Sequence, residues 1–167
     1  METVKRSFAP VVDARTRVLV LGSLPGEESL ARREYYGNPR NHFWRLTGAV
    51  IGEALEPLPY EARLERLLEA GVGLWDTIGA ATRRGSLDGA IRGVEANPLA
   101  ELIESLPELR AVGFNGGRSA SLGLRQLAGR PLALLPLPSS SPAYTLPFAA
   151  KLERWMALRP FLAARSS

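Results

Sequence analysis

The sequence predicts an α/β fold, with a four-stranded parallel sheet covered by helices on both faces. Two observations indicate this class. Four short apolar segments alternate along the chain with segments whose apolar residues recur at helical spacing. The first apolar segment, Val18 to Leu21, contains no polar residue, as is typical of strands buried on both faces. Because right-handed crossovers join such strands, the connecting helices lie on both sides of the sheet.

The first strand, about residues 17–21, leads into a long polar segment. Gly22, Pro25 and Gly26 end the strand and permit a close approach of the backbone to another group. The segment is rich in rings and amides, which suit a flat ligand with a polar edge, such as a nucleobase, since rings stack on its face and amides bond its edge. These residues are Tyr35, Tyr36, Asn38, Asn41, His42, Phe43 and Trp44.

Two helices and a second strand are expected next. The first helix runs from residue 41 or 42 to about 51, with apolar residues at helical spacing. The second covers about 60–70, and Gly71 follows it where a C-terminal stop is expected. Residues 72–75 then form a short strand, with Asp76 at its carboxyl end.

The second half of the chain repeats this alternation. Residues 77–96 show no clear periodicity, so a second long polar segment is expected there. Asn97 and Pro98 are predicted to start a helix that Asn97 caps. The remaining elements are a strand at about 110–114, a helix at about 118–127, a strand at about 131–135, a hydroxyl-rich segment at 136–145 and a last helix at about 147–159.

The polar segments are expected to meet at one edge of the sheet. In parallel α/β sheets, ligands bind at the carboxyl ends of the strands. The segments that begin at Gly22, Asp76, Asn115 and Pro136 all leave those ends. We therefore expect them to form one cleft.

Composition limits the chemistry that this cleft could perform. The chain has 167 residues, which suits one compact domain. It has no cysteine and one histidine, so disulfides, iron–sulfur clusters and a two-histidine zinc site are excluded, and we expect no metal. The net charge of +4 is compatible with a phosphate-bearing partner. There is no apolar run of membrane-spanning length and no secretory signal, so we expect a cytoplasmic protein that does not enter a membrane.

No common nucleotide-binding or hydrolase motif is present. The sequence lacks the phosphate-binding loop, the dinucleotide fingerprint and the nucleophile elbow. The cleft would instead contain amides, hydroxyls, aromatic rings and Asp76. This set fits hydrolysis of an N-glycosidic bond, because that barrier falls through positioning and electrostatics, with an amide oxygen holding the attacking water.

Six motifs, in consistent order over about residues 17–160, resemble the uracil-DNA glycosylase superfamily and, within it, the hypoxanthine-DNA glycosylase branch. The resemblance implies a three-layer α/β/α sandwich and a single domain (1–167) with its core at about 17–160. It implies a monofunctional DNA repair glycosylase that needs no cofactor. Such an enzyme flips a deaminated base, hypoxanthine or possibly uracil, out of double-stranded DNA and leaves an abasic site. The motifs are Gly22–Gly26, Tyr35–Trp44, Gly73–Asp76, Gly85–Ile91, Phe114–Gly116 and Leu137–Pro142.

The resemblance also implies roles for particular residues. Asn41 matches the catalytic amide that positions water, and Tyr36 matches the aromatic ring that stacks under the flipped base. Leu24 occupies a place where mismatch-specific relatives carry Asn. Tyr144 stands where the branch often has Asn, so its ring is a candidate wedge. The expected base-binding residues are Tyr36, Gly22, Ser23, Asp76 and Asn115, and the expected DNA-binding residues are Ser139, Ser140, Ser141, Pro142 and Tyr144.

Several alternatives stay open. Asn41 could instead cap the following helix through the amide of Phe43 or Trp44, and Asn115 could simply belong to a turn. A uracil- or mismatch-specific glycosylase of the same fold is an alternative function. A catalytically weak module that binds damaged DNA is another. A monomer is expected, since no exposed apolar stripe is evident.

Overall fold

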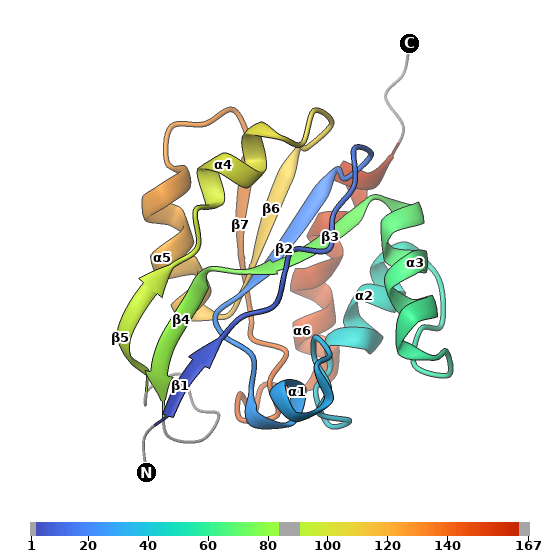
Figure 1. Cartoon of the computed structure of the whole chain (residues 1–167). Helices are drawn as coiled ribbons and strands as arrows, with labels where there is room; N and C mark the ends of the chain where they lie inside the picture. The colour runs from blue at the N-terminus through green and yellow to red at the C-terminus, as the bar shows by residue number, and fades with distance from the viewer. Residues whose placement is uncertain (1–2, 84–90, 164–167) are drawn as a thin grey trace.

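A computed structural model describes residues 3–83 and 91–163 of the chain (Figure 1). Its centre is a four-stranded parallel sheet in the order β3-β2-β6-β7. This confirms the predicted sheet, and each strand lies within two residues of its expected position. The strands are β2 (Val18–Gly22), β3 (Val72–Asp76), β6 (Ala111–Asn115) and β7 (Ala133–Leu137).

Helices cover both faces of this sheet, so the predicted three-layer arrangement is confirmed (Figure 1). In β2, Val18 and Val20 face one helical layer, and Leu19 and Leu21 face the other. All four are fully buried, which explains the unbroken apolar run. The first layer contains α2 (Phe43–Ile51), α3 (Tyr60–Ala70) and α6 (Phe148–Trp155), and the second contains α4 (Leu99–Glu104) and α5 (Gly117–Leu127).

A second, antiparallel sheet was missed by the sequence analysis. Its strands are β1 (Thr3–Arg6), β4 (Ile78–Arg83) and β5 (Ile91–Ala96), in the order β1-β4-β5. The expectation of an irregular polar segment over 77–96 was therefore wrong for β4 and β5. Glycines and two register shifts disturb the alternation of side chains there. Most of the Gly85–Ile91 motif lies outside the described residues.

Three helical predictions need correction. The long segment after β2 contains a short helix, α1 (Glu27–Arg32). Pro98 rather than Asn97 stands at the N-cap of α4, and the Asn97 Nδ2 instead donates to the Asp76 carbonyl at 2.8 Å. The last helix ends at Trp155, where a 3-10 helix (Met156–Leu162) that contains Pro160 continues the chain.

The contact between α5 and β6 is unusually close. A Cβ built on Gly123 would lie 2.2 Å from the Phe114 Cε1, and Phe114 is fully buried. We expect Gly123→Ala to lower the free energy of unfolding by about 1–3 kcal/mol, because the ring must move within a packed core. Thermal unfolding would show a Tm several degrees lower. Gly117→Ala on the same helix is the control, since no atom beyond its chain neighbours and its own helix backbone lies within 4 Å of its Cβ position. Equal Tm values for both variants would contradict the expectation.

Candidate active site

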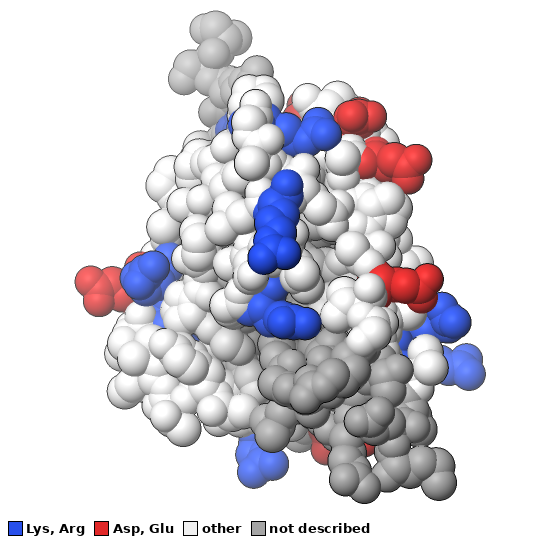
Figure 2. All heavy atoms as spheres, turned by 90° about the vertical axis from the view of Figure 1, so that its left-hand side faces the viewer, with Lys and Arg blue, Asp and Glu red and all other residues white. Residues whose placement is uncertain are grey.

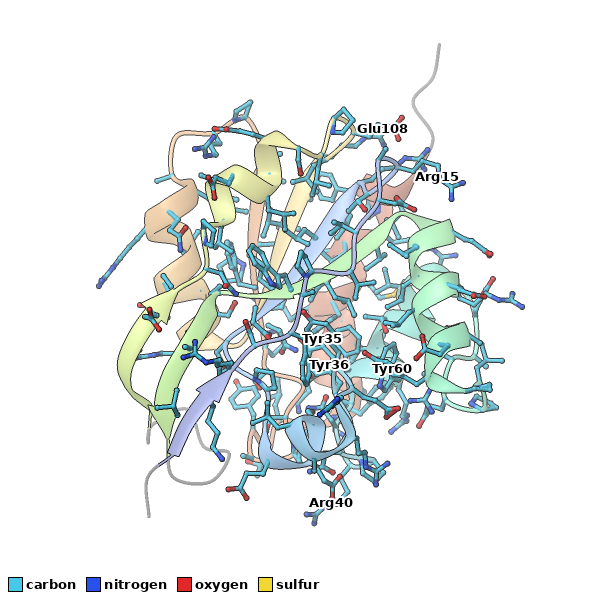
Figure 3. All side chains as sticks on the ribbon, viewed as in Figure 1. Arg15, Tyr35, Tyr36, Arg40, Tyr60 and Glu108 are labelled. Atoms are coloured by element: carbon cyan, nitrogen blue, oxygen red, sulfur yellow. The ribbon has the colours of Figure 1, made fainter. Side chains whose placement is uncertain are left out.

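A cavity of about 550 Å³ opens at the carboxyl ends of the parallel strands. The strand ends, the segment around α1 and the segment after β7 form its walls. In Figure 3, Tyr35 and Tyr36 lie inside the molecule above α1, whereas Arg40 points away from it. The cavity brings together every residue expected to be catalytic or to bind the base or the DNA: Gly22, Ser23, Tyr36, Asn41, Asp76, Asn115, Ser139, Ser140, Ser141, Pro142 and Tyr144. His42, Phe43 and Trp44, in contrast, do not line it.

The cavity wall contains a close contact of three residues, Gly22, Asp76 and Tyr36. A Cβ on Gly22 would lie 2.6 Å from Asp76 Oδ1 and 3.0 Å from the Tyr36 hydroxyl. Only glycine therefore fits between the carboxylate and the phenol. Asp76 is 4% exposed, and its backbone is fixed by the hydrogen bond from Asn97. The carboxylate thus occupies a defined position at the end of β3.

Tyr36 is held from several sides. Its φ of 53° lies in the left-handed region, which costs a non-glycine residue about 1 kcal/mol or more and often occurs at functional sites. Its ring stacks on Phe43 with the centroids 3.7 Å apart and the planes 8° from parallel. The indole Nε1 of Trp44 donates to the Tyr36 carbonyl at 3.1 Å. The ring is therefore fixed in the cavity wall, with aromatic side chains behind it.

Asn41 lies on the cavity wall just before α2. Its Oδ1 accepts the Phe43 backbone N–H at 2.9 Å, the contact expected if Asn41 is structural. This bond also fixes which end of the amide is oxygen. An amide oxygen has a second lone pair, and the Nδ2 has two hydrogens. The contact with Phe43 therefore orients Asn41 without using all of its hydrogen-bonding capacity.

Three segments are tied together at Ser140, which is 1% exposed. Its carbonyl accepts the His42 backbone N–H at 3.0 Å, and its own N–H donates to Asn115 Oδ1 at 2.8 Å. The Nδ2 of Asn115 donates to Ser140 Oγ at 2.9 Å and approaches the Tyr36 hydroxyl at 3.3 Å. We call these contacts the Ser140 junction. Asn115 uses most of its capacity in this junction, so it orients its neighbours.

The segment after β7 is ordered by its own hydroxyl groups. Ser139 Oγ accepts the Ser141 N–H, and Ser141 Oγ accepts the Ala143 N–H, both at 3.1 Å. Tyr144 is 46% exposed, one of two exposed large hydrophobic residues in the described part of the chain. The segment therefore offers polar groups and one ring at the rim of the cavity.

Burial controls the protonation of three residues near the site. It lowers the pKa of His42, and the charges of Lys151 and Arg45 lower it further, so His42 is neutral at neutral pH. Burial also lowers the pKa of Lys151. The pKa of Tyr35 is raised strongly by burial and then by the Asp76 carboxylate. Tyr35 is therefore a neutral phenol, and it donates to the Ala9 carbonyl at 2.8 Å.

Sequence reasoning missed some residues at the site. The acidic side chains of Glu27 and Glu28 come from α1, which was not predicted, and both line the cavity. Lys151 lies behind the segment after β7; its position among the apolar residues of α6 was the available signal. Within residues 3–83 and 91–163, no group of three His, Asp or Glu side chains could hold a metal ion. No helix in those ranges is long and apolar enough to cross a membrane.

Known proteins share this fold and much of this sequence. A family model of the uracil DNA glycosylase superfamily matches residues 9–159. A hypoxanthine DNA glycosylase of Methanosarcina acetivorans is 45% identical over 140 residues, which cover 84% of this chain and 88% of that protein. A hypoxanthine DNA glycosylase of Methanosarcina barkeri is 45% identical over 115 residues, 69% of this chain and 73% of the relative.

A solved structure agrees with these relatives. The solution NMR structure of a candidate uracil DNA glycosylase from Methanosarcina acetivorans has a TM-score of 0.86 and 40% sequence identity. The match covers 95% of this chain and 99% of the other. The chain belongs to the uracil DNA glycosylase superfamily. It is a DNA glycosylase, a hydrolase that acts on N-glycosyl bonds, and its substrate is DNA.

Proposed function

We propose that this DNA glycosylase removes hypoxanthine, and secondarily uracil, from double-stranded DNA and leaves an abasic site. The observation that carries the proposal is the position of Asn41 on the wall of one cavity together with Tyr36 and Asp76. The two relatives named hypoxanthine DNA glycosylase support the choice of base. The cavity is large enough for a flipped nucleotide and lies at the strand ends where α/β proteins bind ligands.

Asn41 is the catalytic residue in this proposal. The Phe43 N–H orients its amide, and the remaining lone pair of Oδ1 accepts a hydrogen bond from the attacking water. The water then adds to C1′ as the sugar becomes oxocarbenium-like. Leu24 is buried and apolar, so the first motif supplies no second amide at this place. Catalysis therefore depends on one amide.

The base would lie between Tyr36 and the end of β3. The ring of Tyr36 is backed by Phe43 on one side, so the base stacks on the side of the ring away from Phe43. Gly22 and Ser23 let the backbone approach the base closely, and Asp76 contacts its polar edge. Asn115 acts on the base through Tyr36 and Ser140, to which it is hydrogen bonded.

The segment Ser139–Tyr144 would bind the DNA strand. The hydroxyl groups of Ser139 and Ser141 are suited to phosphate oxygens, and Tyr144 is exposed at the rim, where a ring could enter the stack. The face that carries α5 and β5 shows scattered basic side chains without one continuous patch (Figure 2). We infer that the protein is cytoplasmic and forms a single domain and a monomer. Light scattering in solution would test the oligomeric state.

The direct test is base excision. Duplexes that carry a single hypoxanthine or a single uracil are incubated with the protein, and alkali then cleaves the strand at any abasic site. We expect cleavage at hypoxanthine to be faster than at uracil. Faster cleavage at uracil would favour the alternative, a uracil- or mismatch-specific enzyme. No cleavage of either duplex by folded protein, combined with tight binding of abasic DNA, would favour a damage-binding module.

Tyr36 offers a test of base stacking. We expect Tyr36→Ala to weaken the binding of hypoxanthine-containing DNA by roughly tenfold to a hundredfold, since stacking of one base is worth about 1–3 kcal/mol. Tyr36→Phe keeps the ring and removes the hydroxyl that contacts Asn115, so its affinity should change less than about fivefold. The apparent dissociation constants are obtained from the dependence of the single-turnover excision rate on protein concentration. Equal losses in both variants would show that the hydroxyl, and not the ring, matters.

A further inference from the structure

Lys151 is a buried cation directly behind the Ser139–Tyr144 segment. Its side chain, on α6, is 0% exposed. Its Nζ donates to the Ser141 carbonyl at 3.2 Å and lies 5.6 Å from the centre of the Tyr144 ring. The ammonium therefore contacts the backbone and the ring of the segment that forms the cavity rim.

The surroundings of Lys151 do not neutralise its charge. Within the described part of the chain, no carboxylate lies within salt-bridge distance of the Nζ. A carbonyl oxygen and an aromatic ring compensate a buried ammonium only in part. Burial lowers the pKa of Lys151, as expected for an incompletely compensated cation. The free protein thus keeps a costly charge beside its proposed DNA-binding segment.

The choice of lysine at this position is unusual for this chain. Of its 21 basic residues, only Lys5 and Lys151 are lysines, and the others are arginines. An ammonium is a compact point charge on a flexible stem, whereas a guanidinium is broad and planar. The only fully buried basic side chain among the described residues is thus one of the two lysines.

We propose that Lys151 is a positioning residue for DNA binding: its Nζ holds the Ser141 carbonyl, so that the hydroxyl groups of Ser139 and Ser141, which accept backbone N–H groups of the segment, can donate their protons to a phosphate of the bound strand. The phosphate supplies the negative charge that Lys151 lacks in the free protein. Lys151 itself stays behind the segment and does not touch the reacting atoms. The inference rests on the proposed function, since it assumes that this segment binds DNA.

The proposed role of Lys151 predicts that its replacement changes the affinity for DNA but not the excision rate or the stability. If Lys151 only supported the fold, its replacement by an apolar side chain of similar length would weaken stability, affinity and excision together. If it positions the segment for a phosphate, the same replacement removes a charge that is costly in the free protein and useful in the complex. Lys151→Met should therefore weaken DNA binding without lowering the Tm.

The experiment compares Lys151→Met with Arg154→Met. Arg154 lies on the same helix, carries the same charge and is exposed, so it controls for net charge. Fluorescence anisotropy gives the Kd for a duplex with a stable abasic-site analogue. Single-turnover excision at saturating protein gives the rate of the chemical step, and thermal unfolding gives the Tm. We expect about a tenfold increase in Kd for Lys151→Met, with the excision rate within about threefold of wild type and the Tm unchanged or higher.

Each outcome decides the matter. The Kd of Arg154→Met should stay within about threefold of the wild-type value. An unchanged Kd for folded Lys151→Met would overturn the proposal. A lower Tm together with losses in both affinity and rate would also overturn it, in favour of a purely structural role. If wild-type protein excises neither base but binds abasic DNA, the proposed function fails, while the Kd comparison still tests Lys151.

Discussion

Asn41→Ala should lower the rate of hypoxanthine excision by about 100-fold to 1,000-fold, the effect of removing one positioned polar group from a reaction of this kind. The measurement is single-turnover cleavage of a hypoxanthine duplex after alkali treatment. The affinity for abasic-site DNA should change little, because the amide acts on the water and not on the strand. The effect should be large because buried Leu24 leaves no second amide in the first motif.

The same variant also loses a structural contact, so the two roles must be separated. The Asn41 Oδ1 accepts the Phe43 N–H, and replacing such a residue costs about 1 kcal/mol of stability. Asn41→Asp keeps an oxygen for that N–H and an oxygen for water. It should therefore keep wild-type stability and more excision than Asn41→Ala. Should Asn41→Ala excise hypoxanthine at a wild-type rate once folded, Asn41 would be a structural residue only.

Gly22→Ala is expected to have the second largest effect. The new Cβ would lie within 2.6 Å of Asp76 Oδ1 and 3.0 Å of the Tyr36 hydroxyl. Both side chains must then move in the wall that contacts the base. A misplacement of this size at a reacting centre costs about 100-fold in rate. We expect kcat/KM for hypoxanthine DNA to fall by roughly that factor, measured by steady-state excision.

Gly117→Ala is the matched control for this variant. No atom beyond its chain neighbours and its own helix backbone lies within 4 Å of its Cβ position, and Gly117 does not line the cavity. Its kcat/KM should stay near that of wild type. Because Gly22 ends a buried strand, circular dichroism must confirm that Gly22→Ala is folded. Normal excision by folded Gly22→Ala would mean that the base does not bind against Asp76 and Tyr36.

The parts of the fold that could be predicted are those with local signals. Val18 to Leu21 is apolar throughout because helices cover both sides of β2, and Gly71 ends α3 in the left-handed conformation that favours glycine. The pairing of β1 with β4 has no such signal, since it joins residues about 80 positions apart in a sheet with irregular register. Its stability depends on tertiary contacts that no short window of sequence contains.

The sequence predicted which residues form the site but not which of them contact one another. Parallel strands bring their carboxyl ends to one edge, so residues such as Gly22 and Asp76 were expected to meet. The sequence did not indicate that Asn115 bonds Ser140 and Tyr36, or that Lys151 reaches the Ser141 carbonyl. These contacts depend on side-chain directions across long sequence separations. Asn41 showed the opposite problem, because both interpretations of this residue are compatible with its geometry.

The Ser140 junction has a consequence for the kinetics of recognition. It joins the residue after Asn41, the end of β6 and the segment after β7 through hydrogen bonds that exist without DNA. The conformational entropy of these segments is therefore lost when the protein folds, and little ordering remains for the encounter with a damaged strand. Intact and damaged duplexes should then associate with the protein at similar rates. Discrimination between the two duplexes would appear in their dissociation rates, because only a base that fits the rigid cavity prolongs the complex.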